Sequence, residues 1–196
     1  MLDAYRERVR AMGSKVNRRM SEIGQSLSGI EMTVAQRMVV DVFSGIKDNQ
    51  PIDVERPDGS RHVIMRQGNE RGAGAKHSVF RHYDTGTGVI SAVDVLKIPE
   101  VIEKGNITEK RRGNVRLVEY RYTDENGTRY TVVTEVKKKG EVFNDFYTNK
   151  KASNQTPQMP NGDTPESART NDNDANSGAK LQKAGDNTSD IAKDPA

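Results

Sequence analysis

The first 28 residues alternate between apolar and polar side chains with a helical period. Apolar side chains recur at spacings of three and four, which predicts an amphipathic helix with a face close to a heptad seam. We expect this face to pack against another helix, in the same chain or in a helix-mediated oligomer. A second apolar run, residues 34–43, predicts another helix that ends near Ser44 and Gly45. The apolar positions of the first helix are Leu2, Tyr5, Val9, Met12, Val16, Met20, Ile23 and Leu27.

The pattern changes after Pro51. Residues 52–67 alternate around Pro57-Asp58-Gly59, a turn sequence, and therefore predict a β-hairpin. Residues 76–83 predict a short helix or turn. A further helix is expected to begin near Lys97, because Pro99 fits the first turn of a helix, and to end at Gly105.

Three strands are expected in the last part of this region. Residues 115–123 and 130–136 flank an Asn-Gly turn, and residues 141–147 form the third strand. The two-residue period of a strand would place Phe143 and Tyr147 on one face and Thr148 and Lys150 on the other. The predicted fold class is α+β, with a helix packed on an antiparallel sheet.

Composition limits how much of the chain can fold. Hydrophobic residues make up 33% and the mean hydropathy is −0.84, which is too polar for a compact fold over all 196 residues. From Ala152 onward there is no aromatic residue, so burial cannot offset the entropy of ordering. We therefore expect a helical segment at 1–50, a folded domain at 51–151 and a disordered polar tail at 152–196.

Charge is concentrated in the middle of the chain. Residues 60–151 carry eighteen Lys and Arg against twelve Asp and Glu, a net charge of +6, whereas residues 152–196 carry four against seven, a net charge of −3. A polyanionic partner is therefore expected in the middle region. The absence of cysteine excludes disulfides, thiolate metal sites and cysteine nucleophiles. No apolar run approaches the ~20 residues that span a bilayer, so no membrane partner is expected.

Two of the three histidines lie close together in a basic segment. His77 and His82 accompany Lys76 and Arg81. Residues five apart do not face each other on a helix, and no third ligand is nearby, so we expect neither a metal nor another cofactor. Histidine titrates near pH 6.5 and can act as a general acid or base, while the two cations can stabilise a phosphorane. The alternative is that one histidine packs under the sheet and the others are solvated.

The order of these segments resembles a known nuclease family. The Lys76-to-His82 cluster is followed by Asp-Val-Leu-Lys-Ile-Pro-Glu-Val-Ile at 94–102, a Tyr-rich hairpin and Phe143–Thr148. Over residues 60–151 this resembles the phage-borne nuclease domains of the barnase–EndoU–colicin–RelE type, which occur in phage head-associated proteins and polymorphic toxins. The resemblance implies metal-independent cleavage of RNA by its own 2′-hydroxyl group.

The resemblance also implies roles for individual residues. It implies His77 and His82 as acid and base in either order, Arg81 as a catalytic cation, and Tyr147 or Thr148 as a hydroxyl group at the site. We further expect Lys76, Lys97 and Lys150 to contact RNA phosphates. The implied partners are an RNA substrate and either a cognate immunity protein or phage head proteins, in the bacterial cytoplasm or associated with a virion.

Two other functions fit the same residues. The first is a non-catalytic phage structural or adaptor module, whose basic sheet would bind nucleic acid or a protein; the heptad-like first helix supports it. The second and weaker one is a metal-dependent DNA nuclease.

Overall fold

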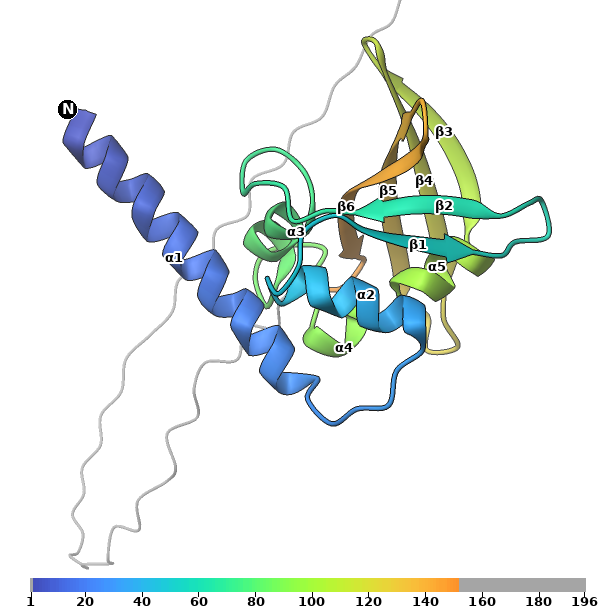
Figure 1. The fold of residues 1–196 in the computed structure, drawn as a ribbon, viewed down its shortest axis with the longest axis horizontal. Helices are drawn as coiled ribbons and strands as arrows, with labels where there is room; N and C mark the ends of the chain where they lie inside the picture. The colour runs from blue at the N-terminus through green and yellow to red at the C-terminus, as the bar shows by residue number, and fades with distance from the viewer. Residues whose placement is uncertain (1, 152–196) are drawn as a thin grey trace, which may run out of the picture. The chain divides into compact units, whose positions relative to one another are not determined.

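The fold is α+β, as predicted. The computed structural model describes residues 2–151; the expected tail, residues 152–196, lies outside the described residues. Figure 1 shows the helices gathered on one side of a curled sheet. The helices are α1 (Leu2–Ser26), α2 (Val34–Phe43), α3 (Ala75–His82), α4 (Ala92–Val95) and α5 (Ile98–Lys104). The strands are β1 (Gln50–Val54), β2 (Arg61–Met65), β3 (Asn106–Arg112), β4 (Val115–Thr123), β5 (Arg129–Lys137) and β6 (Gly140–Thr148).

The six strands form one mixed sheet with the order β1-β2-β6-β5-β4-β3. The predicted hairpin (β1 and β2) and the predicted meander (β4 to β6) are both present and antiparallel. The two pieces join through a parallel pairing of β2 with β6. The sheet is therefore mixed, whereas we expected a wholly antiparallel one. Parallel neighbours need a long connection, and here α3, α4 and α5 lie within it.

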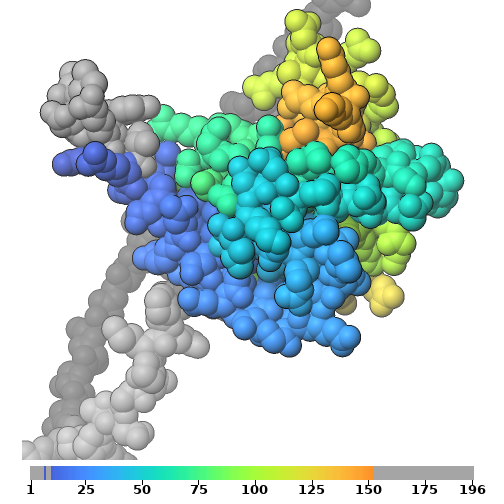
Figure 2. Space-filling model, viewed as in Figure 1, coloured from blue at the N-terminus to red at the C-terminus, as the bar shows by residue number. Residues whose placement is uncertain are grey.

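The predicted apolar stripe of α1 packs into the core from Val16 onward. Val16, Met20, Ile23 and Leu27 are buried together with side chains of α2 and the sheet. The described residues, 2–151, all lie within one compact unit. The helices of the predicted segment 1–50 therefore share one hydrophobic core with the sheet. Figure 2 shows α1, α2 and the β1–β2 hairpin on one face of this unit. Among the described residues, no helix is both long and apolar enough to cross a bilayer.

Strand β3 was not predicted. It lies at the edge of the sheet, paired only with β4, and only Ile107 on it is apolar. All residues of β3 except Ile107 are exposed, so the strand has no face against the core that would require apolar alternation. The available signal was the Gly113-Asn114 pair, a two-residue hairpin turn between β3 and β4.

Strand β6 contains a β-bulge that changes which side chains share a face. The pairing with β5 shifts between Val133 and Thr134, so that Asn144 is an extra residue. As a result Phe143, Phe146 and Thr148 are buried, whereas Tyr147 lies on the opposite face. The prediction that Phe143 and Tyr147 share one face was therefore wrong, because a two-residue period does not continue through a bulge.

Candidate functional site

Helix α3 is attached to the sheet at this bulge. The Gly74 amide, at the N-cap of α3, donates a hydrogen bond of 2.6 Å to the Asn144 carbonyl. One turn later, the Ser78 hydroxyl donates to Asp145 Oδ1 at 2.8 Å. Gly74 has φ of 102°, and a Cβ there would lie 2.7 Å from the Gln67 carbonyl oxygen, so the close approach requires glycine. The bulge thus fixes the position of α3 relative to β6.

The two clustered histidines of α3 converge on Asp145. Nε2 of His77 lies 3.8 Å and Nε2 of His82 lies 3.6 Å from Asp145 Oδ2. All three side chains are 17–18% exposed. The i, i+5 spacing therefore does not keep the two rings apart. His82 is the last residue of α3, and the aspartate that both rings face, Asp145, comes from the sheet.

The orientation of each imidazole is set by a backbone carbonyl. Nδ1 of His77 is 3.0 Å from the Glu70 carbonyl oxygen, and Nδ1 of His82 is 3.0 Å from the Thr87 carbonyl oxygen. A carbonyl only accepts, so each Nδ1 carries the proton and donates. In the neutral form, Nε2 of each ring is therefore left as the basic nitrogen, facing Asp145.

The electrostatics of the site couple His82 to Asp145. Burial acts to lower the pKa of His82, but the neighbouring Asp145 carboxylate outweighs burial and raises it above the usual value. Burial acts in the opposite direction on Asp145, and His82 together with the Ser78 hydroxyl holds the pKa of that carboxyl below its usual value. The pair therefore favours an ionised aspartate beside a protonated His82.

These groups line an open cavity of about 570 Å³. Both histidines and Asp145 form part of its wall, and so does Tyr147, whose ring centroid lies 5.5 Å from that of His82. Four cationic residues from three segments surround them, which makes the cavity suitable for an anion. These cations are Arg81, Arg129, Lys150 and Lys151.

The loop after α3 closes one side of the cavity. The Gly88 amide donates to the Lys150 carbonyl at 2.9 Å, and the Thr148 amide donates to the Gly88 carbonyl at 3.2 Å. Gly88 has φ of 74°, and a Cβ there would lie 3.1 Å from Tyr147 Cβ and 3.2 Å from His82 Nδ1. Sequence reasoning missed this loop, although its Gly-Thr-Gly sequence is a turn signal.

The structure brings together some of the predicted site residues and not others. His77, Arg81, His82, Tyr147, Thr148 and Lys150 all line the cavity, whereas Lys76 and Lys97 do not. Lys97 instead pairs with Glu100 at 2.8 Å. Sequence reasoning missed Asp145, although its position one residue before an aromatic pair in the last strand made it visible as a polar residue within an apolar run.

Two of the residues in the cavity wall are already engaged. The Thr148 hydroxyl donates to the Val89 carbonyl at 2.6 Å and accepts from the Lys150 amide at 3.0 Å. The Lys150 ammonium lies 2.8 Å from Asp94. Burial acts to raise the pKa of Asp94, but Lys150 and Ser91 hold it below its usual value. Thr148 and Lys150 thus tie the end of β6 to its neighbours, which leaves Tyr147 as the hydroxyl group for the site.

Known proteins give no further guide to this cavity. No protein-family model matches the chain, and neither a curated protein nor a solved structure matches it. Within residues 2–151, no group of three or more His, Cys, Asp or Glu side chains is arranged to hold a metal ion.

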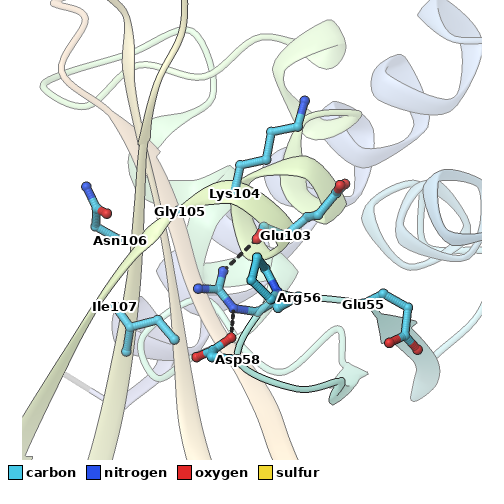
Figure 3. Close-up of a pocket in the computed structure, with 9 residues that line it drawn as sticks. Glu55, Arg56, Asp58, Glu103, Lys104, Gly105, Asn106 and Ile107 are labelled. Atoms are coloured by element: carbon cyan, nitrogen blue, oxygen red, sulfur yellow. Dashed lines mark hydrogen bonds and ion pairs between the residues drawn. The ribbon is translucent and has the colours of Figure 1, made fainter.

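A second cavity, of about 710 Å³, lies between the β1–β2 turn and the end of α5. Figure 3 shows the Arg56 guanidinium bonded to Asp58 and to the Glu103 carbonyl. Arg56 also lies over the Tyr120 ring, 5.5 Å from its centroid, and is only 9% exposed. Its donors therefore serve to hold the turn against α5, and this cavity lacks the paired acid–base groups of the first.

Proposed function

We propose that the His77–His82 cavity cleaves RNA without a metal ion, by attack of the 2′-hydroxyl group on the adjacent phosphate. The observation that carries the proposal is that two imidazoles in fixed tautomers converge on one half-buried carboxylate inside a cationic cavity. Such a site offers a proton acceptor, a proton donor and charge for the phosphate, which are the groups that this reaction uses.

The two histidines would have different tasks. Asp145 raises the pKa of His82, and so His82 would donate its Nε2 proton to the 5′-oxygen as the P–O5′ bond breaks. His77 would accept the 2′-hydroxyl proton on its Nε2 as the new P–O2′ bond forms. The products are a 2′,3′-cyclic phosphate and a free 5′-hydroxyl group. In total, the 2′-hydroxyl group gives one proton to His77, and the 5′-oxygen receives one proton from His82.

The cations of the cavity wall would bind the phosphate. Arg81 and Arg129 are exposed and line the cavity. The guanidinium group can bind two phosphate oxygens at once, which suits the charge that builds up on a phosphorane. Tyr147, half-buried beside His82, would add a hydroxyl donor. The order of the sequence segments supports assignment to the phage-borne toxin nucleases, for which an immunity protein would be the natural inhibitor.

The experiment is a cleavage assay with the full chain on single-stranded RNA in the presence of a chelator. We expect cleavage to leave 2′,3′-cyclic phosphate and 5′-hydroxyl ends. An RNA with 2′-O-methyl groups should be resistant because it lacks the nucleophile. Cleavage that stops in the chelator, or equal cleavage of DNA, would show that the reaction is of another kind.

Binding without cleavage is the second candidate. It is favoured by the fact that both Nε2 atoms face a carboxylate within the protein, so the site is already internally paired. In that case the 2′-O-methyl RNA should bind in a salt-dependent way, while the wild-type protein leaves unmodified RNA intact.

A further inference from the structure

One face of the sheet continues from the cavity toward β3. Residues paired across neighbouring strands point to the same side. The register therefore places Arg121, Thr131 and Tyr147 in one row, and Glu119, Val133 and Asp145 in the next. The opposite face carries Tyr120, Val132 and Phe146, which belong to the core with the helices. Asp145 is thus both a wall of the cavity and the end of a row on the polar face.

This polar face holds a compact cluster of charges. Lys110 donates to Glu119 at 2.6 Å, and Arg121 donates to the other oxygen of the same carboxylate. Glu119 is 9% exposed, whereas Lys110 and Arg121 are 50% and 42% exposed. Two cations share one carboxylate, so one positive charge is left without a partner in the cluster.

Tyr147 connects the charge cluster with the cavity. Its ring contacts His82 on one side. Its hydroxyl group also lies in the field of Glu119, Arg121 and Lys110. Burial above all, and then Glu119 and Asp145, raise the pKa of Tyr147. The hydroxyl group therefore stays protonated, and the half-buried ring offers an aromatic surface next to the reacting groups.

We infer that Lys110, Arg121 and Tyr147, here called the strand path, hold the RNA that continues from the scissile phosphate. The inference rests on the proposed function. Aromatic rings flanked by cations are the usual means of binding single-stranded nucleic acid, since bases stack on the ring and phosphates meet the cations. From β6 to β4 is two strand spacings, about 10 Å, so the path extends past the nucleotides in the cavity.

Strand β4 supplies a matched control on its other face. Arg116 is 49% exposed and pairs with Glu109, much as Arg121 pairs with Glu119. The register places Arg116 one residue out of phase with Arg121, on the face away from the strand path. A substitution of either arginine by glutamine therefore removes the same charge from the same strand.

The experiment measures binding of 2′-O-methyl RNA to the full chain at several salt concentrations. Each phosphate contact contributes about −0.7 to the slope of log affinity against log salt for single strands. Arg121→Gln and Lys110→Gln should each reduce the slope by about this amount, whereas Arg116→Gln should leave it unchanged. Glu119→Gln, which frees both cations, should make the slope steeper. Melting temperatures show that each variant is folded.

Cleavage rates separate this inference from the proposed function. If the strand path holds the RNA, Arg121→Gln should lower kcat/KM about tenfold more on a longer RNA than on a dinucleotide, a difference of about 1.4 kcal/mol. Equal salt slopes for Arg116→Gln and Arg121→Gln would overturn the inference even if RNA is cleaved. If wild type cleaves no RNA but the slopes differ as expected, the proposed function fails and the strand path stands.

Discussion

The protein places histidine against aspartate in two different settings. On the β1–β2 hairpin, His62 Nδ1 lies 2.7 Å from Asp53 Oδ1, and the two side chains are 45% and 73% exposed. In the cavity, His77 and His82 lie 3.8 and 3.6 Å from Asp145, and none of the three is more than 18% exposed. The shorter contact is thus the one in water, and the longer contacts are the ones shielded from it.

The comparison shows that contact distance alone does not identify a site. Exposed ion pairs are screened by solvent and contribute about 1 kcal/mol at most. A buried carboxylate has fewer waters to stabilise its charge and depends on its neighbours, so its coupling to them is stronger. His62 lies on β2, away from the cluster formed by His77 and His82. Three tests, in order of expected effect, probe the contrast between the two settings.

The largest effect is expected for removal of either cavity histidine. His77→Ala and His82→Ala should each lower the rate of RNA cleavage about 10²–10⁴-fold, because each removes a general acid or base. His62→Ala is the control and should keep the wild-type rate. Cleavage rates and melting temperatures are measured for all three variants. The assignment is wrong if His62→Ala is the inactive variant, or if folded cavity variants cleave at the wild-type rate.

A smaller effect is expected when each aspartate becomes asparagine. Asp145→Asn removes the charge that raises the pKa of His82, so the loss of activity at high pH should begin at a lower pH. At neutral pH the rate should fall on the order of tenfold, about 1.4 kcal/mol. Asp53→Asn should leave the pH profile of kcat/KM as it is. Identical profiles for Asp145→Asn and wild type would show that His82 does not act as the acid.

The smallest effect concerns stability against pH. The lowered pKa of Asp145 contributes stability above its ordinary value of 3.8, which is lost as the pH falls. The raised pKa of His82 contributes stability below its ordinary value of 6.5, which is lost as the pH rises through the folded value. The stabilisation from the Asp145–His82 pair should therefore be greatest between about pH 3.8 and pH 6.5.

Urea unfolding across this pH range tests that window. Asp145→Asn should flatten the dependence of the free energy of unfolding on pH in both directions. His62→Ala should change the free energy of unfolding by no more than about 0.5 kcal/mol at any pH, as exposed substitutions usually do. A wild-type profile without a maximum between acid and neutral pH would contradict the coupling.

Much of the fold could be predicted because its elements carry strong local signals. The stripe of α1, the turn at Pro57 and the Asn126-Gly127 turn each depend on a few neighbouring residues, and each gave the right element. Strand β3 and the parallel pairing of β2 with β6 could not be predicted in this way. Both depend on contacts between distant segments, which leave no period in the sequence.

The candidate site was predicted in part for the same reason. His77, Arg81 and His82 lie within one short helix, so the sequence shows their proximity directly. Asp145 lies more than sixty residues away, on β6 directly after the bulge. Lys97 and Lys150 were both expected to bind phosphate, but only Lys150 lines the cavity, where it pairs with Asp94. A cation count cannot distinguish a lysine in the cavity wall from one outside it.

The extra residue Asn144 has a consequence for how this site could be lost in evolution. A deletion of Asn144 would restore a regular ladder between β5 and β6 and would keep the alternation of Phe143 and Phe146 on the core face. The carbonyl that anchors the start of α3 would be gone, and with it a hydrogen bond that holds α3 and its two histidines beside Asp145. Under the proposed function, a descendant one residue shorter in β6 would therefore keep its core and every histidine and still fail to cleave RNA. In an alignment, the length of this strand would be as informative as the histidines themselves.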